Sequence, residues 1–265
     1  MMGFGASTLI LGNLANSLFQ MRSVGWQKTY VIIGVLLGAV LVASGLFIKR
    51  PGGDVVFSAA VKKNGKNKEN FETRSYKPLE MVKRFTFWRA FFGLVFLTAV
   101  GSSVIGFAKD LAQSVGADAS LATTLVGVLA VCNGLGRIIT GAVFDALGRR
   151  ITMIGASALT IVAAGVTLIA VFSGSLPLCI VGLCLTGLSY GTAPTVASAF
   201  TSSFYGPGYF ATNFSIINFN LIGASFIATL CSSLMTQSGG YVVPFALLLM
   251  LAVVSLFLNL SIRRP

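Results

Sequence analysis

The sequence has 265 residues, of which 55% are hydrophobic and only 10% are charged, and its mean hydropathy is +0.87. A soluble domain carries about 25% charged residues, so this composition indicates a polytopic membrane protein. The chain has no histidine and only seven acidic residues, which excludes most general acid–base, Ser-His-Asp and His–metal chemistry. We therefore expect no enzymatic activity, no catalytic or metal site and no cofactor.

Eight apolar runs are long enough to cross a bilayer, whose core of about 30 Å requires about 20 helical residues. The sequence therefore predicts an all-α membrane protein with eight transmembrane helices. The predicted spans are 1–20, 29–48, 86–108, 119–142, 151–172, 175–199, 209–233 and 240–262. The first span is the weakest, because Asn13 and Asn16 interrupt it.

The Lys and Arg residues fall unevenly between the two sides that these spans define. The segment 49–85 carries ten of them, and the hairpin 143–150 and the C-terminus add four on the same side, whereas the other side receives only Arg22, Lys28 and Lys109. By the positive-inside rule, both termini and the segment 49–85 are predicted to be cytoplasmic, in a multi-pass protein of the cell (inner) membrane. This distribution explains the net charge of +12, so lipids surround the chain and no nucleic-acid partner is expected.

The spans divide the chain into residues 1–48, with two spans, a basic linker at 49–85, and residues 86–265, with six spans. The tract KKNGKNKEN (62–70) within the linker is interpreted as a solvated segment, with weak attraction to anionic lipid as the alternative. Pro78 and Glu80 predict the start of a short helix that leads into the third span.

An arginine, Arg137, lies inside the fourth span, eight residues before Asp145 and so about 12 Å from it along a helix. An arginine at this depth costs about 2.5–3.5 kcal/mol on insertion scales, so it normally faces a bundle interior or an aqueous cavity. The alternative is that its side chain reaches back to the headgroups. Asn133 is one turn earlier on the same face, and a guanidinium beside an amide suits a small carboxylate.

The polar stretch that follows Arg137 forms a cytoplasmic hairpin with a recognisable spacing. The pattern G-x-x-x-D-x-x-G-R-R consists of Gly141, Asp145, Gly148, Arg149 and Arg150. It resembles the signature loop of the major facilitator superfamily. Together with N-G-x-G-R at 133–137, YKPLEMVK at 76–83 and GFGAS at 3–7, it is similar to the oxalate/formate antiporter-like branch of that superfamily.

The resemblance implies twelve spans in two halves that alternately expose a central site. It implies that residues 86–265 are the complete six-helix second half, that residues 1–48 are the last two spans of the first half, and that the first four spans are missing. The hairpin would be a gate element, or it would only build a stable turn and anchor the orientation of the chain in the membrane. The missing spans would be supplied by a separate or longer chain.

Residues of the substrate site are also implied by the resemblance. Oxalate-transporting members use an arginine in the eighth span, whose place Arg137 takes, and a lysine in the eleventh span, whose counterpart here (208–226) is uncharged. One fixed cation favours a monocarboxylate-like anion over oxalate. The remaining candidate site residues are Asn133, Asn213, Asn218, Asn220 and Tyr190. Asn213 and Asn220 are seven positions apart, so we expect them on one face of the helix. Hydrogen bonding between helices is the alternative role for the three later asparagines.

The sequence thus predicts a secondary transporter of small organic anions, with exchange, uniport and ion coupling all left open. The alternative is a truncated or accessory membrane protein that does not transport and needs a partner chain. The four cysteines, Cys132, Cys179, Cys184 and Cys231, form no C-x-x-C pair and are interpreted as small packing residues.

Overall fold

The computed structural model describes residues 11, 14–15, 17–19, 21, 25–47 and 75–262. Helix α2 (Gly25–Phe47) belongs to one compact unit and the helices α3 to α10 belong to a second, so each unit is described by itself. Seven helices among the described residues are long and apolar enough to cross a membrane, and these include α2. The chain is therefore a multi-pass, all-helical membrane protein.

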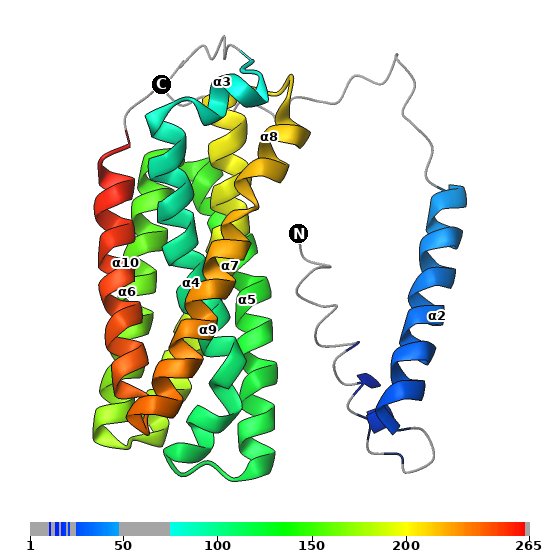
Figure 1. Cartoon of the computed structure of the whole chain (residues 1–265), viewed down its shortest axis with the longest axis vertical. Helices are drawn as coiled ribbons and strands as arrows, with labels where there is room; N and C mark the ends of the chain where they lie inside the picture. Colours follow the sequence, from blue (N-terminus) through cyan, green and yellow to red (C-terminus); the bar gives the residue numbers. More distant parts are fainter. Residues whose placement is uncertain are drawn as a thin grey trace. The chain divides into compact units, whose positions relative to one another are not determined.

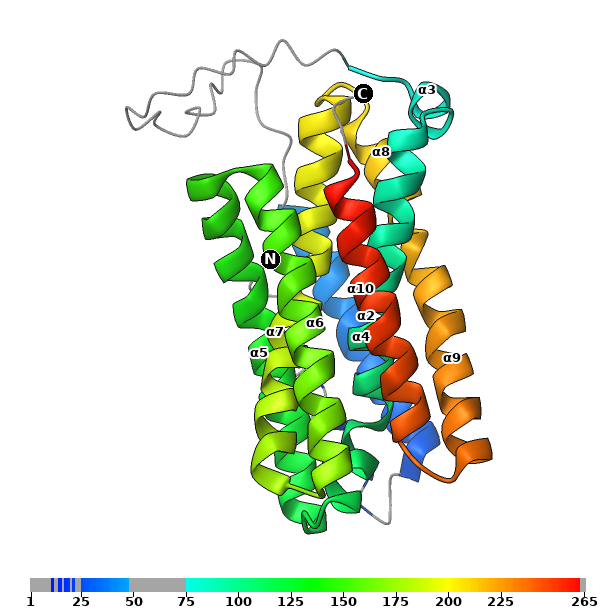
Figure 2. The same ribbon diagram turned by 90° about the vertical axis from the view of Figure 1, so that its left-hand side faces the viewer.

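The second unit is a bundle of six membrane-length segments (Figures 1 and 2). A short helix, α3 (Pro78–Val82), precedes them, with Pro78 in its first turn and Glu80 near its N-terminus, which confirms the predicted helix start. The segments are α4 (Phe85–Ser114), α5 (Ala119–Leu147), α6 (Arg149–Ser173), α7 (Leu176–Tyr205), α8 (Phe210–Ile217) with α9 (Asn220–Ser238), and α10 (Val242–Leu260).

Seven of the predicted spans correspond to these helices, since α2 matches 29–48 and the bundle matches the six spans after residue 86. The predicted span 1–20 lies largely outside the described residues, so a count of eight spans stays a prediction. The domain boundaries at 48 and 85 also stay predictions, because the linker residues 48–74 are outside the described part of the chain.

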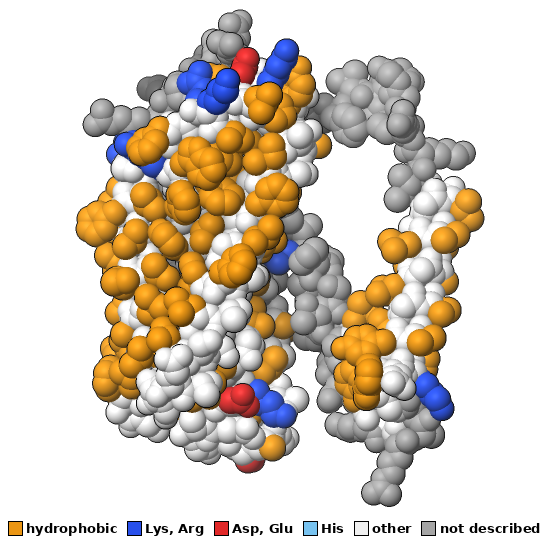
Figure 3. Space-filling model, in the orientation of Figure 1, with side chains coloured by type: hydrophobic (Ala, Val, Ile, Leu, Met, Phe, Trp, Pro, Cys, Tyr) orange, Lys and Arg blue, Asp and Glu red, His pale blue; other side chains and the backbone are white. Residues whose placement is uncertain are grey.

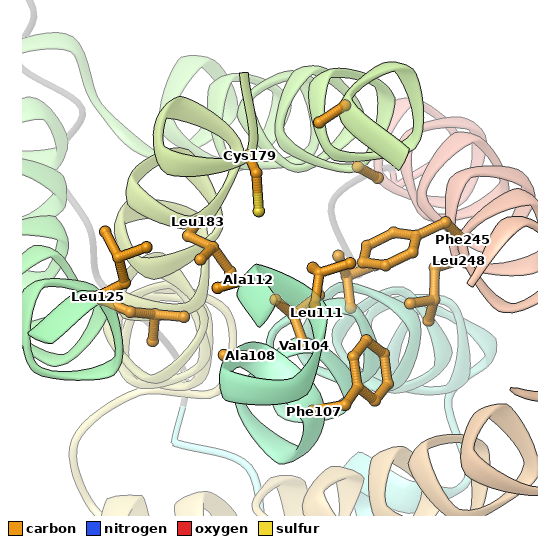
Figure 4. Packing of buried hydrophobic residues seen from close by; sticks show 14 of the residues in the cluster. Val104, Phe107, Ala108, Leu111, Ala112, Leu125, Cys179, Leu183, Phe245 and Leu248 are labelled. Carbon is orange, nitrogen blue, oxygen red and sulfur yellow. The ribbon is translucent and has the colours of Figure 1, made fainter. Parts of the chain in front are cut away.

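Helix α7 lies between α5 and α6 and packs along both of them, while α4 packs against α9 and α10. The core between these helices is apolar, and its side chains come mainly from α4, α5, α7 and α10 (Figure 4). Its labelled members are Val104, Phe107, Ala108, Leu111, Ala112, Leu125, Cys179, Leu183, Phe245 and Leu248. Large aliphatic and aromatic side chains alternate here with alanines, which lets the helices approach closely.

Two of the bundle's segments depart from a straight helix. In α4 the backbone leaves the helical region at Phe107 (φ −125°, ψ 17°), whose ring lies 5.7 Å from the ring of Phe245 on α10. Between α8 and α9, Asn218 and Phe219 form a tight turn held by bonds from Phe219 N to Ile216 O and from Leu221 N to Asn218 O. The predicted span 209–233 is therefore two helices joined at an angle (Figure 1).

Hydrogen bonds between helices tie the outer members of the bundle together. Ser255 of α10 donates to the Gly93 carbonyl of α4 at 2.8 Å, and Asn259 of α10 donates to Ser157 of α6 at 2.6 Å. Thr160 of α6 and Ser189 of α7 share a further bond of 2.6 Å. Such bonds contribute about 0.6–2 kcal/mol each inside a bilayer, so α6 and α10 are held to the rest of the bundle by polar as well as apolar contacts.

Charged side chains of the bundle gather mostly at its two ends (Figure 3). The end that carries α3 and the α5–α6 connection has six basic residues against Glu80 and Asp145, and these basic residues are Lys77, Lys83, Arg84, Arg89, Arg149 and Arg150. The opposite end, at the α4–α5 connection, has Lys109, Asp110 and Asp118. The flank between the ends is predominantly apolar, as a lipid-facing surface requires.

Candidate functional site

Arg137 is the charged side chain that the bundle encloses most deeply. It lies ten residues before the end of α5 at Leu147, which is about 15 Å of helix. Its side chain is only 7% exposed. The alternative that the guanidinium reaches back to the membrane surface is hard to reconcile with this burial, because a snorkelling side chain leaves its charged tip in water.

Asn133 supports Arg137 from one turn earlier on α5. Its side-chain oxygen Oδ1 accepts a hydrogen bond of 3.4 Å from Nε of Arg137. The two residues are neighbours on one helix face because they are four positions apart. The amide thus holds the guanidinium along α5, and the predicted pairing of these two candidate site residues is found in the structure.

The backbones of α5 and α7 touch beside Arg137 because three glycines lie in the contact. A Cβ atom at Gly191 would overlap the carbonyl oxygen of Asn133, and it would lie 3.0 Å from the backbone nitrogen of Arg137. A Cβ at Gly136 would overlap the carbonyl oxygen of Leu188, and one at Gly187 would meet Leu129. Small residues commonly permit such close helix contacts in membranes. Here they place the polar residues of α7 against Arg137.

Tyr190 of α7 is brought to Arg137 by this contact. The two side chains interact electrostatically, and Tyr190 is half-buried. On its other side the Tyr190 ring fills the space over Gly101 of α4, where a Cβ would overlap the ring. The structure therefore unites three candidate residues, Arg137, Asn133 and Tyr190, on two helices. It adds Gly101, which sequence reasoning missed because nothing in the sequence shows which helix faces Tyr190.

Two of the three candidate asparagines of the segment formed by α8 and α9 form hydrogen bonds away from Arg137. Asn213 is buried and donates to the carbonyl oxygen of Tyr76 at 3.0 Å, and Asn220 accepts from the Thr98 hydroxyl at 3.2 Å and donates to the carbonyl oxygen of Ile217 at 2.6 Å. Asn218 is half-buried at the turn between the helices. Helix α9 packs mainly on α4 and α10. The bond between Asn220 and Thr98 therefore matches the alternative role of a contact between helices, whereas Asn213 ties α8 to the chain before α3.

The turn between α8 and α9 also removes the reason for placing Asn213 and Asn220 on one face. That expectation assumed a continuous helix, in which residues seven apart share a face. The turn at Asn218 and Phe219 changes the register, so Asn213 points to the segment before α3 and Asn220 to α4.

The hairpin that carries the gate motif is a one-residue connection. Gly141 and Asp145 lie in the last two turns of α5, Arg149 begins α6, and Gly148 joins the helices with φ 77° and ψ 176°. These angles are accessible almost only to glycine. Asp145 and Arg149 are four positions apart but lie on different helices, because Gly148 separates α5 from α6.

Arg149 contacts the neighbouring helix, whereas Arg150 is exposed. The guanidinium carbon of Arg149 lies 4.0 Å from the centre of the Phe204 ring on α7, a cation–π contact. Arg150 follows it on the outer surface. The hairpin is thus packed onto the end of α7, the helix that also carries Tyr190.

A second polar cluster, which sequence reasoning missed, joins the chain before α3 to the corner between α7 and α8. Tyr76 donates its backbone N–H to the carbonyl oxygen of Tyr205 at 2.9 Å, and Gly208 donates to the Ser75 hydroxyl at 3.1 Å. The guanidinium of Arg84 lies over the Tyr76 ring at 4.6 Å. The pairing of residues more than 100 positions apart has no local signal in the sequence.

Among the residues that the structure describes, no group of three or more His, Cys, Asp or Glu side chains is arranged to hold a metal ion. The polar groups described near Arg137 include the Asn133 amide, which accepts from its Nε, and the Tyr190 side chain of α7. This arrangement offers a positive charge with hydrogen-bonding neighbours, which suits binding of a small anion.

Comparison with known proteins gives two matches. The family model described as Major Facilitator Superfamily matches residues 90–265. The chain is also 27% identical over 208 residues to a protein of Escherichia coli (strain K12) described as "Uncharacterized MFS-type transporter YhjX". The match covers 74% of this chain and 46% of that relative, so the chain spans less than half of the relative's length.

Proposed function

Because the chain belongs to the Major Facilitator Superfamily, we propose that it is part of a secondary transporter that carries small organic anions across the cell membrane by alternating access. Within the superfamily we assign it to the oxalate/formate antiporter-like branch, on the residues 133–150 and 76–83. Whether the transporter exchanges anions or couples them to an ion is left open.

The observation that carries this proposal is the buried Arg137. A cation enclosed among apolar helices lowers the stability of the inserted protein by several kcal/mol. A bound carboxylate offsets that cost, because the planar guanidinium matches both of its oxygens. Asn133 orients the guanidinium through Nε, and Tyr190 lies within electrostatic range of it on α7. Substrate binding gives a physical reason for retaining this charge.

We propose a monocarboxylate-like substrate. The segment formed by α8 and α9 has no charged residue between Phe210 and Ser238, so it supplies no second cation. The second carboxylate of oxalate would then be enclosed without a partner, which is costly in a medium of low dielectric constant. Asn213 and Asn220 have hydrogen-bond partners away from Arg137, and we assign both to structural contacts in this conformation.

The hairpin at 141–150 is proposed as a cytoplasmic gate element. Its basic residues Arg149 and Arg150 lie at the end of the bundle with the greater positive charge, which supports a cytoplasmic location for this end and for the C-terminus. The contact of Arg149 with Phe204 links the hairpin to α7. Movement of α7 during transport would therefore move the hairpin as well.

The working transporter is proposed to contain a further set of spans that pair with this bundle. The support is the match to less than half of a relative described as a transporter. Intact-mass measurement of the protein from its native membrane tests this directly. A mass well above 27.7 kDa agrees with a longer carrier, and a mass of 27.7 kDa directs the search to a partner chain.

The test of the substrate site is Arg137→Gln in the natural full-length protein, reconstituted into liposomes. Uptake of radiolabelled formate, acetate and lactate is measured, with oxalate as the dicarboxylate for comparison. We expect the substitution to abolish monocarboxylate uptake, and Arg137→Lys to retain part of it, because the charge stays while the bidentate geometry is lost.

The matched control is Lys109→Gln, which removes an exposed cation of α4 at the end of the bundle opposite the hairpin 141–150. It should leave uptake unchanged. Normal uptake by Arg137→Gln at equal protein incorporation would remove Arg137 from the substrate site. Preferential uptake of oxalate by the wild-type protein would contradict the assignment to monocarboxylates while leaving Arg137 in place.

A further inference from the structure

Two of the four cysteines lie side by side across the contact between α5 and α7. Cys132 of α5 and Cys184 of α7 are both half-buried, and both face the glycine contact, because Cβ of Cys132 lies against Gly187, one turn after Cys184. They are more than 50 positions apart in the sequence, so the sequence alone does not indicate that they lie close together. Their proximity departs from the interpretation of all four cysteines as packing residues.

The glycine contact fixes this pair in place. A Cβ built on Gly187, which is one turn after Cys184 on α7, would lie 2.8 Å from Cβ of Cys132 and 2.5 Å from the carbonyl oxygen of Leu129. The side chain of Cys132 therefore rests directly on the α7 backbone. Because both cysteines lie on helices in backbone contact, the packing of α5 against α7 fixes the distance between their Cα atoms, and rotation about each Cα–Cβ bond sets the distance between the thiols.

The other two cysteines have different surroundings. Cys179 and Cys231 are both fully buried in the apolar cluster that includes Leu183. Cys132 and Cys184 thus combine partial exposure with positions that face each other across the contact between α5 and α7, whereas Cys179 and Cys231 are fully buried. This difference provides a control within the same chain.

We propose that Cys132 and Cys184 form a dithiol site for trivalent arsenic compounds, in which the arsenic atom is bound by both sulfur atoms. Sulfur ligands favour soft centres over Mg²⁺ or Ca²⁺. With an organic arsenoxide, each thiol gives its proton to the arsenoxide oxygen, two As–S bonds form, the arsenic–oxygen bond breaks and one water leaves. Arsenic stays trivalent, so the reaction needs neither an oxidant nor a reductant.

The test uses the reduced full chain in detergent micelles with phenylarsine oxide, which crosses apolar regions. After removal of excess reagent, intact-mass spectrometry should find one phenylarsenic group per chain. The adduct should survive an excess of a monothiol and be removed by 2,3-dimercaptopropanol, because only a dithiol competes effectively with a two-sulfur chelate.

The cysteine variants separate the pair from the other thiols. Cys132→Ser and Cys184→Ser should each lose the monothiol-resistant adduct, and Cys179→Ser and Cys231→Ser should keep it. Cys132→Ala and Cys184→Ala repeat the test without a new hydroxyl, and gel filtration verifies that each variant is folded. Absence of the adduct in the wild-type chain, or its persistence in a folded Cys132 or Cys184 variant, would overturn the proposal. The readout is mass, so it is independent of transport.

Discussion

The substitution Gly191→Ala tests whether the glycine contact positions Arg137. An alanine Cβ at this position would overlap the carbonyl oxygen of Asn133, and it would lie 3.0 Å from the backbone nitrogen of Arg137 and 3.1 Å from the carbonyl carbon of Asn133. Ordinary contacts of a Cβ begin at 3.4 Å. The two backbones must therefore separate by at least about 0.4 Å (3.4 minus 3.0), and by more at the oxygen, because no flexible side chain can move aside.

The expected cost follows from this overlap. Inserting a methyl group into a well-packed contact typically destabilises a protein by about 1–3 kcal/mol, and a contact against backbone atoms belongs in the upper part of that range. The displacement also shifts α5 at Asn133 and Arg137. We therefore expect reduced stability together with weaker anion uptake in the full-length protein.

The assay is thermal unfolding of the detergent-solubilised protein, followed by uptake in liposomes. Gly155→Ala is the matched control, since a Cβ on this residue of α6 would meet no atom within 4 Å and alanine favours a helix by up to about 1 kcal/mol. The control should be as stable as the wild type or more stable. If Gly191→Ala unfolds at the wild-type temperature, the backbone contact between α5 and α7 is not as close as described.

Two other substitutions test separate features. Thr98→Val removes the bond to Asn220 and should lower the free energy of unfolding by about 0.6–2 kcal/mol. Thr123→Val is the control and should have little effect, because the exposed Thr123 hydroxyl bonds within its own helix. Equal losses of stability would mean that the Thr98–Asn220 bond contributes nothing specific. Gly148→Ala places a side chain at φ 77° and should lower the free energy of unfolding by about 1–3 kcal/mol. Thermal unfolding measures this loss against the control Gly165→Ala in α6. A loss of stability no larger than that of the control would argue against the tight connection between α5 and α6.

The sequence was informative about the helices from α4 to α10 because each requires a long apolar run. The C-terminal ends of several helices were less predictable. Helices α4, α5 and α7 continue to Ser114, Leu147 and Tyr205, five or six residues past the predicted spans, since a helix continues into the polar interface where hydropathy no longer marks it. The turn at Asn218 and Phe219 had no signal, because neither proline nor glycine occurs there.

The candidate site was predictable only in its local part. Asn133 and Arg137 share a helix face at a spacing of four, and the structure pairs them. Tyr190 was a candidate, but its position beside Arg137 depends on the packing of α7 against α5. Asn213 and Asn220 were grouped by spacing along one helix, and the α8–α9 turn directs them to Tyr76 and Thr98 instead. Contacts between distant segments are not encoded in the local pattern of one sequence.

The bonds that join Ser75 and Tyr76 to the corner between α7 and α8 have a mechanical consequence. Three hydrogen bonds, from Tyr76 to Tyr205, from Asn213 to Tyr76 and from Gly208 to Ser75, act on a stretch of two residues. A force on the chain ahead of Ser75 is therefore delivered to the end of α7 before it reaches α3. The helix that ends at this corner carries Tyr190 about four turns away, so a displacement of the corner also displaces one end of the helix that faces α5.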